Sequence, residues 1–98
     1  MLDKMKSLWQ MQQKMQELKR QMDTTDIVVE SADKQLKVVM NGSQEVKEIK
    51  IKGPFSPESR GSLEAGLKDT VNKAIKRSQQ IAAEKMKEIA VPGLSGLL

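Results

Sequence analysis

The side chains available for chemistry are lysine, arginine, aspartate and glutamate, because histidine, cysteine and tyrosine are absent. That composition removes the commonest general base, the thiolate nucleophile and the usual transition-metal ligands. The carboxylates are scattered among lysines and form neither a paired-acid motif nor an Asp-rich calcium loop. We therefore expect no catalytic residue, no metal site, no cofactor and no small-molecule substrate. The sequence predicts a binding protein, not an enzyme.

The net charge of +4 is unevenly distributed along the chain. Residues 1–22 carry five basic and two acidic side chains, whereas residues 23–56 carry five basic and six acidic ones. Basic residues dominate again between 71 and 87, where Glu84 is the one acid. Basic helix faces are often merely solvated, but they also suit the phosphate backbone of nucleic acid. The candidate phosphate-binding residues are Lys4, Lys6, Lys14, Lys19, Arg20, Lys73, Lys76, Arg77, Lys85 and Lys87.

A methionine-leucine stripe runs through the first 22 residues. Met1, Leu8, Met15 and Met22 recur every seven residues, and Met11 and Leu18 lie between them. This spacing predicts a helix of about 33 Å with one apolar seam, ending near Met22. We assign Met11, Met15, Leu18 and Met22 to packing, in part across a dimer interface. Since a chain of this length has little else to cover the seam, the stripe indicates a second long helix or another copy of the chain.

Three short strands are expected next, at Ile27–Val29, from Leu36 to Met40, and around Ile49 and Ile51. The Asn41-Gly42 pair predicts a hairpin between the last two strands. A two-residue loop would place Val38 opposite Glu45. A longer loop, roughly residues 42–45, pairs Val38 with Ile49 and Leu36 with Ile51, and we favour it because it joins apolar to apolar residues.

The last long helix is expected from about Ser62 to Ala90. Ser56 and Pro57 form a helix-start pattern, Gly61 is expected to interrupt it, and Ser62 is a second cap candidate. The 3–4 spacing of an apolar face supports this helix, and Pro92 and Gly93 end it. The members of that face are Leu63, Leu67, Val71, Ala74, Ile75, Ser78, Ile81, Ala82 and Ile89.

The whole pattern is α-β-β-β-α, an α+β fold with long terminal helices around a small antiparallel sheet. Ninety-eight residues form one domain. The chain shows neither a membrane span nor a secretory signal, and it lacks cysteine, so we expect a cytoplasmic protein. Trp9 and Phe55 are too few aromatics to stack unpaired bases, which favours duplex DNA over single strands.

Several segments follow one another in a recognisable order: the Gln/Met/Lys helix of residues 11–16, the Asn41-Gly42 turn, the strand from Val46 to Ile51, the helix segments at 71–75 and 84–86, and the Pro/Gly/Leu tail. Together these segments resemble the YbaB/EbfC family of bacterial nucleoid-associated proteins. The resemblance runs from about Leu8 to the tail, although no single motif is decisive. Residues 32–34 replace the glycine-rich stretch that many members have before the second strand.

The resemblance implies a tweezer-like homodimer in the nucleoid whose helical arms bind duplex DNA. Residues 1–91 would then form a single DNA-binding and dimerisation domain, and residues 92–98 a flexible C-terminal tail. The alternative from the residues themselves is an adaptor or chaperone-like protein, which would use the Met-rich helix to bind a partner protein.

Overall fold

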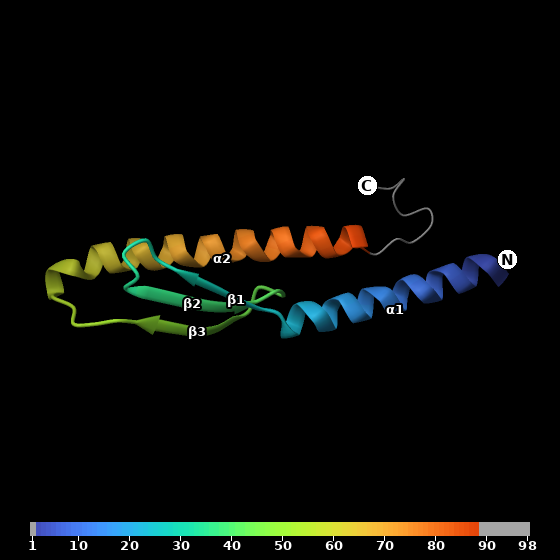
Figure 1. The fold of residues 1–98 in the computed structure, drawn as a ribbon, viewed down its shortest axis with the longest axis horizontal. Helices are drawn as coiled ribbons and strands as arrows, with labels where there is room; N and C mark the ends of the chain where they lie inside the picture. Colours follow the sequence, from blue (N-terminus) through green and yellow to red (C-terminus); the bar gives the residue numbers. More distant parts are fainter. Residues whose placement is uncertain (1, 89–98) are drawn as a thin grey trace.

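The computed structural model describes residues 2–88 and confirms the α-β-β-β-α order (Figure 1). Helix α1 (Leu2–Thr24) leads into strands β1 (Asp26–Glu30), β2 (Leu36–Asn41) and β3 (Val46–Ile51). A short 3₁₀-helix, η1 (Pro57–Ser59), precedes helix α2 (Arg60–Glu88). The strands form one antiparallel sheet in the order β1-β2-β3. Met1, Ile89, the expected helix end at Ala90 and the tail at 92–98 lie outside the described residues.

Helix α1 continues two residues past the predicted end at Met22. Threonine hydroxyls hydrogen-bond to the helix's own carbonyl groups in this last turn: Thr24 donates to Arg20 O at 3.0 Å, and Thr25 donates to Gln21 O at 2.6 Å. These bonds satisfy side chains that would otherwise compete with the helix for backbone groups.

The hairpin between β2 and β3 has the longer loop and the register that the apolar pattern favoured. Leu36 pairs with Ile51 and Val38 with Ile49, and residues 42–45 form the loop. A bulge follows, because Val39 pairs with Glu48 while Met40 pairs with Val46. This shift turns Val46 to the same face of the sheet as Ile49, although the two are an odd number of residues apart.

The start of α2 differs from the expectation. Ser56 and Pro57 do begin a helical segment, and the Ser56 N–H donates to the Ser59 hydroxyl at 3.2 Å. Gly61, however, lies inside α2 and does not interrupt it, and Ser62 is not a cap. The η1 segment leads directly into Arg60, so the helix has already started before Gly61. Gly61 therefore lowers the stability of the helix only through its low helix propensity.

The hydrophobic core lies between α2 and two of the three strands. Val38, Met40 and Ala74 are almost fully buried, and Val29, Leu67, Val71 and Ile75 pack around them. The polar Thr70 and Ser78 are also buried in the face of α2, where each hydroxyl donates to a carbonyl of its own helix. Helix α2 therefore closes one face of the sheet over β1 and β2.

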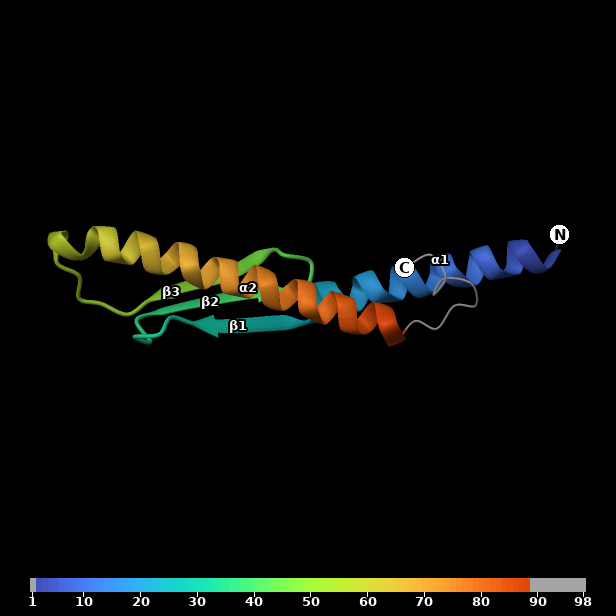
Figure 2. The same cartoon turned by 90° about the horizontal axis from the view of Figure 1, so that it is seen from above.

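The molecule is long and thin. Its extents are 67 × 22 × 15 Å and its radius of gyration is 18.8 Å, against about 12.5 Å for a compact chain of this length. Helix α1 runs antiparallel to α2 and projects beyond the sheet along the long axis of the molecule (Figures 1 and 2). In both views its N-terminal part extends past the described end of α2.

Candidate nucleic-acid interface

The C-terminal end of α1 is joined to the β2–β3 hairpin by a cluster of hydrogen bonds centred on Asn41. The Asn41 amide Nδ2 donates to Asp23 O at 3.3 Å, and its Oδ1 accepts from the backbone N–H groups of Ser43 and Glu45 at 3.0 and 2.9 Å. The Ser43 hydroxyl donates to the Asp23 carboxylate. These bonds set the direction in which α1, with its basic side chains, leaves the sheet.

Gly42 completes this junction, but not through a positive φ. Its N–H donates to Met22 O at 2.8 Å and to Thr25 O at 3.0 Å. A Cβ at this position would lie 2.8 Å from Met22 O and 2.6 Å from Met22 Cε. The left-handed residue of the loop is instead Gln44, with φ 66°. Glycine is therefore needed because the hairpin and α1 approach closely, a contact that the Asn-Gly pattern does not reveal.

Two of the five basic candidates on α1 are already neutralised by carboxylates on the same helix. Lys19 Nζ lies 3.2 Å from Asp23 Oδ2, and Arg20 Nε lies 3.0 Å from Glu17 Oε2. The hydrogen bond from Arg20, with a second from Gln21, lowers the pKa of Glu17 to about 2. Lys4 and Lys6 are exposed on the projecting part of α1 and have no ion-pair partner among residues 2–88.

Lys14 and Lys85 are brought together by the antiparallel helices. They line a small groove of about 250 Å³ between α1 and α2, together with Leu18, Gln21 and two carboxylates, Glu17 and Glu88. Acidic and basic groups are balanced in this groove, so it offers less positive potential than the two lysines would alone.

The exposed basic residues of α2 form the densest cluster. Lys73, Lys76 and Arg77 are all exposed, and their 3–4 spacing places them on neighbouring turns. None of the three has an ion-pair partner within the described part of the chain. Lys87 is exposed nearer the end of the helix. Basic side chains that form no ion pair within residues 2–88 are thus available on α2 and at the N-terminal part of α1.

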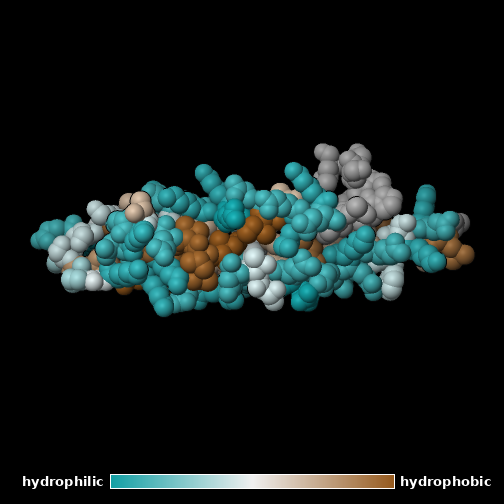
Figure 3. All heavy atoms as spheres, viewed as in Figure 1, coloured by the Kyte–Doolittle hydropathy of each residue, from teal (hydrophilic) through white to brown (hydrophobic). Residues whose placement is uncertain are grey.

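The methionine-leucine stripe is covered along only part of its length. Met22 is buried, Met11 and Leu18 are half-buried, and Met15 is exposed. Helix α1 also carries a second apolar row that was not predicted, formed by Leu2, Met5 and Trp9 at 82, 68 and 59% exposure. Its signal was the 3–4 spacing of these three residues, which the seven-residue repeat obscured. Hydrophobic atoms reach the surface between α2 and the sheet and at the end of α1 (Figure 3).

Residues 2–88 show neither a cluster of metal-ligating side chains nor a membrane-spanning helix. No group of three or more potential metal ligands comes together in this part of the chain. Neither helix there is long and apolar enough to cross a membrane.

Comparison with known proteins agrees with the resemblance seen in the sequence. The chain is 32% identical over 85 residues to a nucleoid-associated protein of Legionella pneumophila, covering 87% of this chain and 76% of that protein. It is 30% identical over 99 residues to a nucleoid-associated protein of Flavobacterium johnsoniae, covering 95% and 92% of the two chains.

The fold is shared with a solved structure. An uncharacterized protein of Helicobacter pylori superimposes with a TM-score of 0.76 over 84% of this chain and 87% of its own, at 17% identity. The profile of the YbaB/EbfC DNA-binding family matches residues 1–94. Profile, relatives and fold agree over nearly the whole length, and the chain belongs to the YbaB/EbfC DNA-binding family.

Proposed function

We propose that this protein is a nucleoid-associated homodimer that binds duplex DNA mainly through contacts to the phosphate backbone. The observation that carries the proposal is the cluster of exposed basic side chains at Lys73, Lys76 and Arg77 on α2, which form no ion pair within residues 2–88. Family membership and the nucleoid-associated relatives support DNA as the partner and the nucleoid as the location.

Contact with the DNA phosphate backbone explains the abundance of lysine on the helices better than recognition of base edges does. Lysine is a flexible point charge that suits phosphate, and helix-borne lysines without a recognition motif position a protein on DNA without specifying sequence. Lys4 and Lys6 on the projecting α1 extend the same kind of surface. Since two protomers double the number of contacts, a dimer binds DNA far more tightly than one chain can.

The salt dependence of binding tests this proposal. Binding to a random duplex, followed by fluorescence anisotropy at several salt concentrations, should give a log–log slope of roughly −5 to −7 if each protomer makes three or four contacts. A variant with Lys73, Lys76 and Arg77 replaced by Gln should bind more weakly and with a flatter slope.

A matched control removes the same number of charges from the sheet and its flanking turns, by replacing Lys34, Lys37 and Lys52 with Gln, none of which has an ion-pair partner in residues 2–88. This control should keep nearly the wild-type slope, because the removed lysines lie away from the basic helix faces. If both triple variants bind with the wild-type slope, the α2 cluster is solvated surface and the backbone-contact proposal fails.

A second candidate function is adaptor or chaperone-like binding of a partner protein through α1. The exposed Leu2, Met5 and Trp9 favour it, because a projecting apolar helix face suits a partner helix. Replacing the three with Gln distinguishes the candidates: DNA affinity should survive in a DNA-binding protein, whereas an adaptor would lose its partner.

A further inference from the structure

The Asn41-Gly42 pair has a chemical reactivity that its place in the hairpin does not use. The backbone nitrogen of the residue after an asparagine can attack the asparagine side chain, and glycine favours this attack because no side chain hinders its nitrogen. The asparagines of the chain are Asn41 and Asn72, and Asn72 is followed by the bulkier Lys73. The sequence therefore favours the reaction at Asn41.

The reaction replaces the side-chain amide of Asn41 by a carboxyl group. Gly42 N forms a bond to Asn41 Cγ, the Cγ–Nδ2 bond breaks, and the side-chain nitrogen leaves as ammonia with the proton of the Gly42 N–H. Water then opens the resulting succinimide ring by adding its hydroxyl to one carbonyl carbon and its proton to the nitrogen. Attack at the side-chain carbon gives aspartate, whereas attack at the backbone carbon gives isoaspartate, in which the main chain runs through the former side chain.

The folded protein holds the attacking nitrogen and the leaving nitrogen in hydrogen bonds. The Gly42 N–H donates to Met22 O at 2.8 Å and to Thr25 O at 3.0 Å, so it is bonded to the end of α1. The Nδ2 of Asn41 donates to Glu45 Oε1 at 2.9 Å, and Asn41 is only 5% exposed. Attack requires the Gly42 N–H to leave α1 first.

The carbonyl group of the Asn41 side chain is already polarised. Its Oδ1 accepts from the backbone N–H groups of Ser43 and Glu45, at 3.0 and 2.9 Å. Two donors on a carbonyl oxygen stabilise the negative charge that develops there when a nucleophile attacks. The contact between Gly42 and α1 is therefore the barrier that the fold adds to the reaction.

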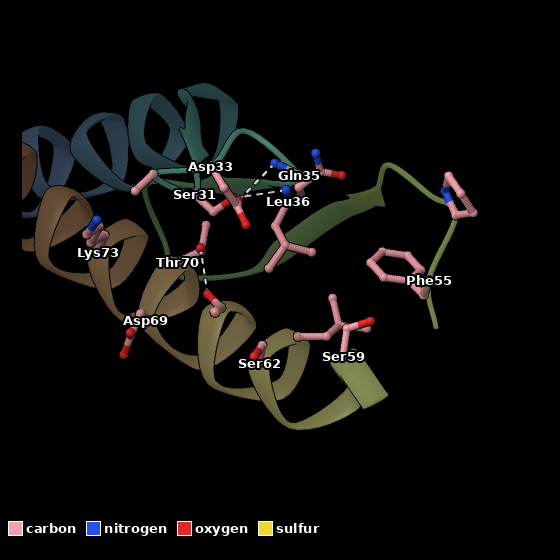
Figure 4. A pocket seen from close by; sticks show the side chains of 14 residues that line it. Ser31, Asp33, Gln35, Leu36, Phe55, Ser59, Ser62, Asp69, Thr70 and Lys73 are labelled. Carbon is pink, nitrogen blue, oxygen red and sulfur yellow. Dashed lines mark hydrogen bonds between the residues drawn. The ribbon is translucent and has the colours of Figure 1, made fainter. Parts of the chain in front are cut away.

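The β1–β2 turn, at the other end of the sheet, has similar side-chain bonds but depends on no helix. The Oδ1 of Asp33 accepts from the Ser31 hydroxyl at 2.6 Å and from the Gln35 N–H at 3.0 Å (Figure 4). The N–H of the next residue, Lys34, donates to Ser31 O at 2.9 Å within the same turn. The β2–β3 hairpin differs because a separate element, α1, binds its reactive N–H.

From this geometry we infer that Asn41 is a deamidation site that α1 holds closed, and that it reacts when α1 separates from the hairpin. The product keeps the junction from closing again. A carboxylate oxygen in place of Nδ2 would lie 2.9 Å from Glu45 Oε1 and 3.3 Å from Asp23 O, where only a donor is favourable. Isoaspartate would lengthen the main chain beside Gly42, where even a Cβ has no space. Modified chains therefore lose the fixed direction of α1.

Peptide mass spectrometry of folded and unfolded protein tests the closed state. Trypsin places Asn41 and Asn72 in separate peptides, residues 38–47 and 69–73. In mildly alkaline buffer, deamidation at Asn41 should be at least roughly tenfold slower in the folded protein than in guanidinium, because it requires the open junction. Asn72 serves as the internal reference and should react slowly in both. Equal rates at Asn41 in the two states would overturn the closed site.

Two serine variants identify which opening exposes Asn41. Ser43→Ala removes the hydroxyl that binds Asp23, so it should speed deamidation of the folded protein and leave the rate in guanidinium unchanged. The matched control is Ser31→Ala, which removes a hydroxyl of the same kind from the β1–β2 turn and should not speed it. If both variants speed the reaction equally, it proceeds through global unfolding and α1 is not the gate.

The effect of the product is tested with Asn41→Asp, which should melt at a lower temperature than wild type. Adding Glu45→Gln should restore part of the loss, because the glutamine amide can donate to the new carboxylate. Asn72→Asp, at an exposed position of α2, is the control and should melt like wild type. An Asn41→Asp protein that melts like wild type, or that Glu45→Gln does not improve, would overturn the proposed opening of the junction.

Discussion

Gly42 lies directly beside the last turn of α1, and two backbones can approach this closely only when one of them lacks a side chain. The nearest atoms to a hypothetical Cβ include the Met22 carbonyl oxygen, which cannot move without displacing the helix. The residue thus connects a local turn to the direction of a 23-residue helix. Asn41 and Ser43 add directional hydrogen bonds to the same junction.

Gly42→Ala should therefore destabilise the protein by about 1–3 kcal/mol, as over-packed sites do. The matched control is Gly61→Ala, where a Cβ meets nothing within 4 Å. Because Gly61 lies inside α2, its replacement should stabilise by roughly 0.5–1 kcal/mol. Urea unfolding of both variants measures the two changes, and equal shifts in the same direction would contradict the close-approach explanation.

Asp23 makes the junction sensitive to acid. Hydrogen bonds from Ser43 and Lys19 lower the pKa of its carboxyl group in the folded protein. A lowered folded pKa means that the ionised group adds stability above the unfolded pKa, and that this stability is lost as pH falls through the folded value.

Asp23→Asn should accordingly lower the melting temperature at neutral pH and lose less stability than wild type as the solution is acidified below about pH 4. Circular-dichroism melts over a pH series measure both curves, which should converge at low pH. Ser43→Ala, which removes the hydrogen bond that lowers this pKa most, should behave in the same direction. Parallel curves for wild type and Asp23→Asn would show that the carboxylate has no such role.

At the level of elements, apolar patterns predicted more than charge patterns did. The register of β2 and β3 followed from matching Leu36 and Val38 to Ile51 and Ile49, since a slip would have exposed a buried face. The bulge between Val46 and Glu48 was not predicted, because the alternating pattern of a regular strand has no place for the extra residue. The pairing of Lys19 and Arg20 with carboxylates was also missed, although the 3–4 spacing to Asp23 and Glu17 is visible in the sequence.

The two ends of α1 should contribute unequally to DNA binding. Replacing Lys4 and Lys6 with Gln removes unpaired charge, whereas replacing Lys19 and Arg20 with Gln removes charge already balanced on the same helix. Both double variants lose the same formal charge. Anisotropy titrations at one salt concentration should show the larger loss of affinity for the first pair. The opposite order would mean that DNA displaces Asp23 and Glu17 from their partners.

At the scale of the whole molecule, the chain is much more extended than a compact domain of the same length, because its radius of gyration is 18.8 Å. Only two of the three strands are covered by α2, and much of α1 projects beyond any described partner. The sequence indicated an extended protomer, because it predicted two long helices and a methionine-leucine stripe that a chain of this length can hardly cover. It could not show which face stays open, because that depends on where α2 crosses the sheet.

A homodimer built on such a protomer couples folding to association, so its thermal stability should depend on protein concentration. The melting temperature should rise as the concentration is increased from the nanomolar to the micromolar range. Added salt should change this dependence little if the proposed dimer is held by apolar contacts, while the same salt should sharply weaken DNA binding. A wild-type melting temperature that is constant over that range would show that the protomer is stable alone, with its open β3 face in water.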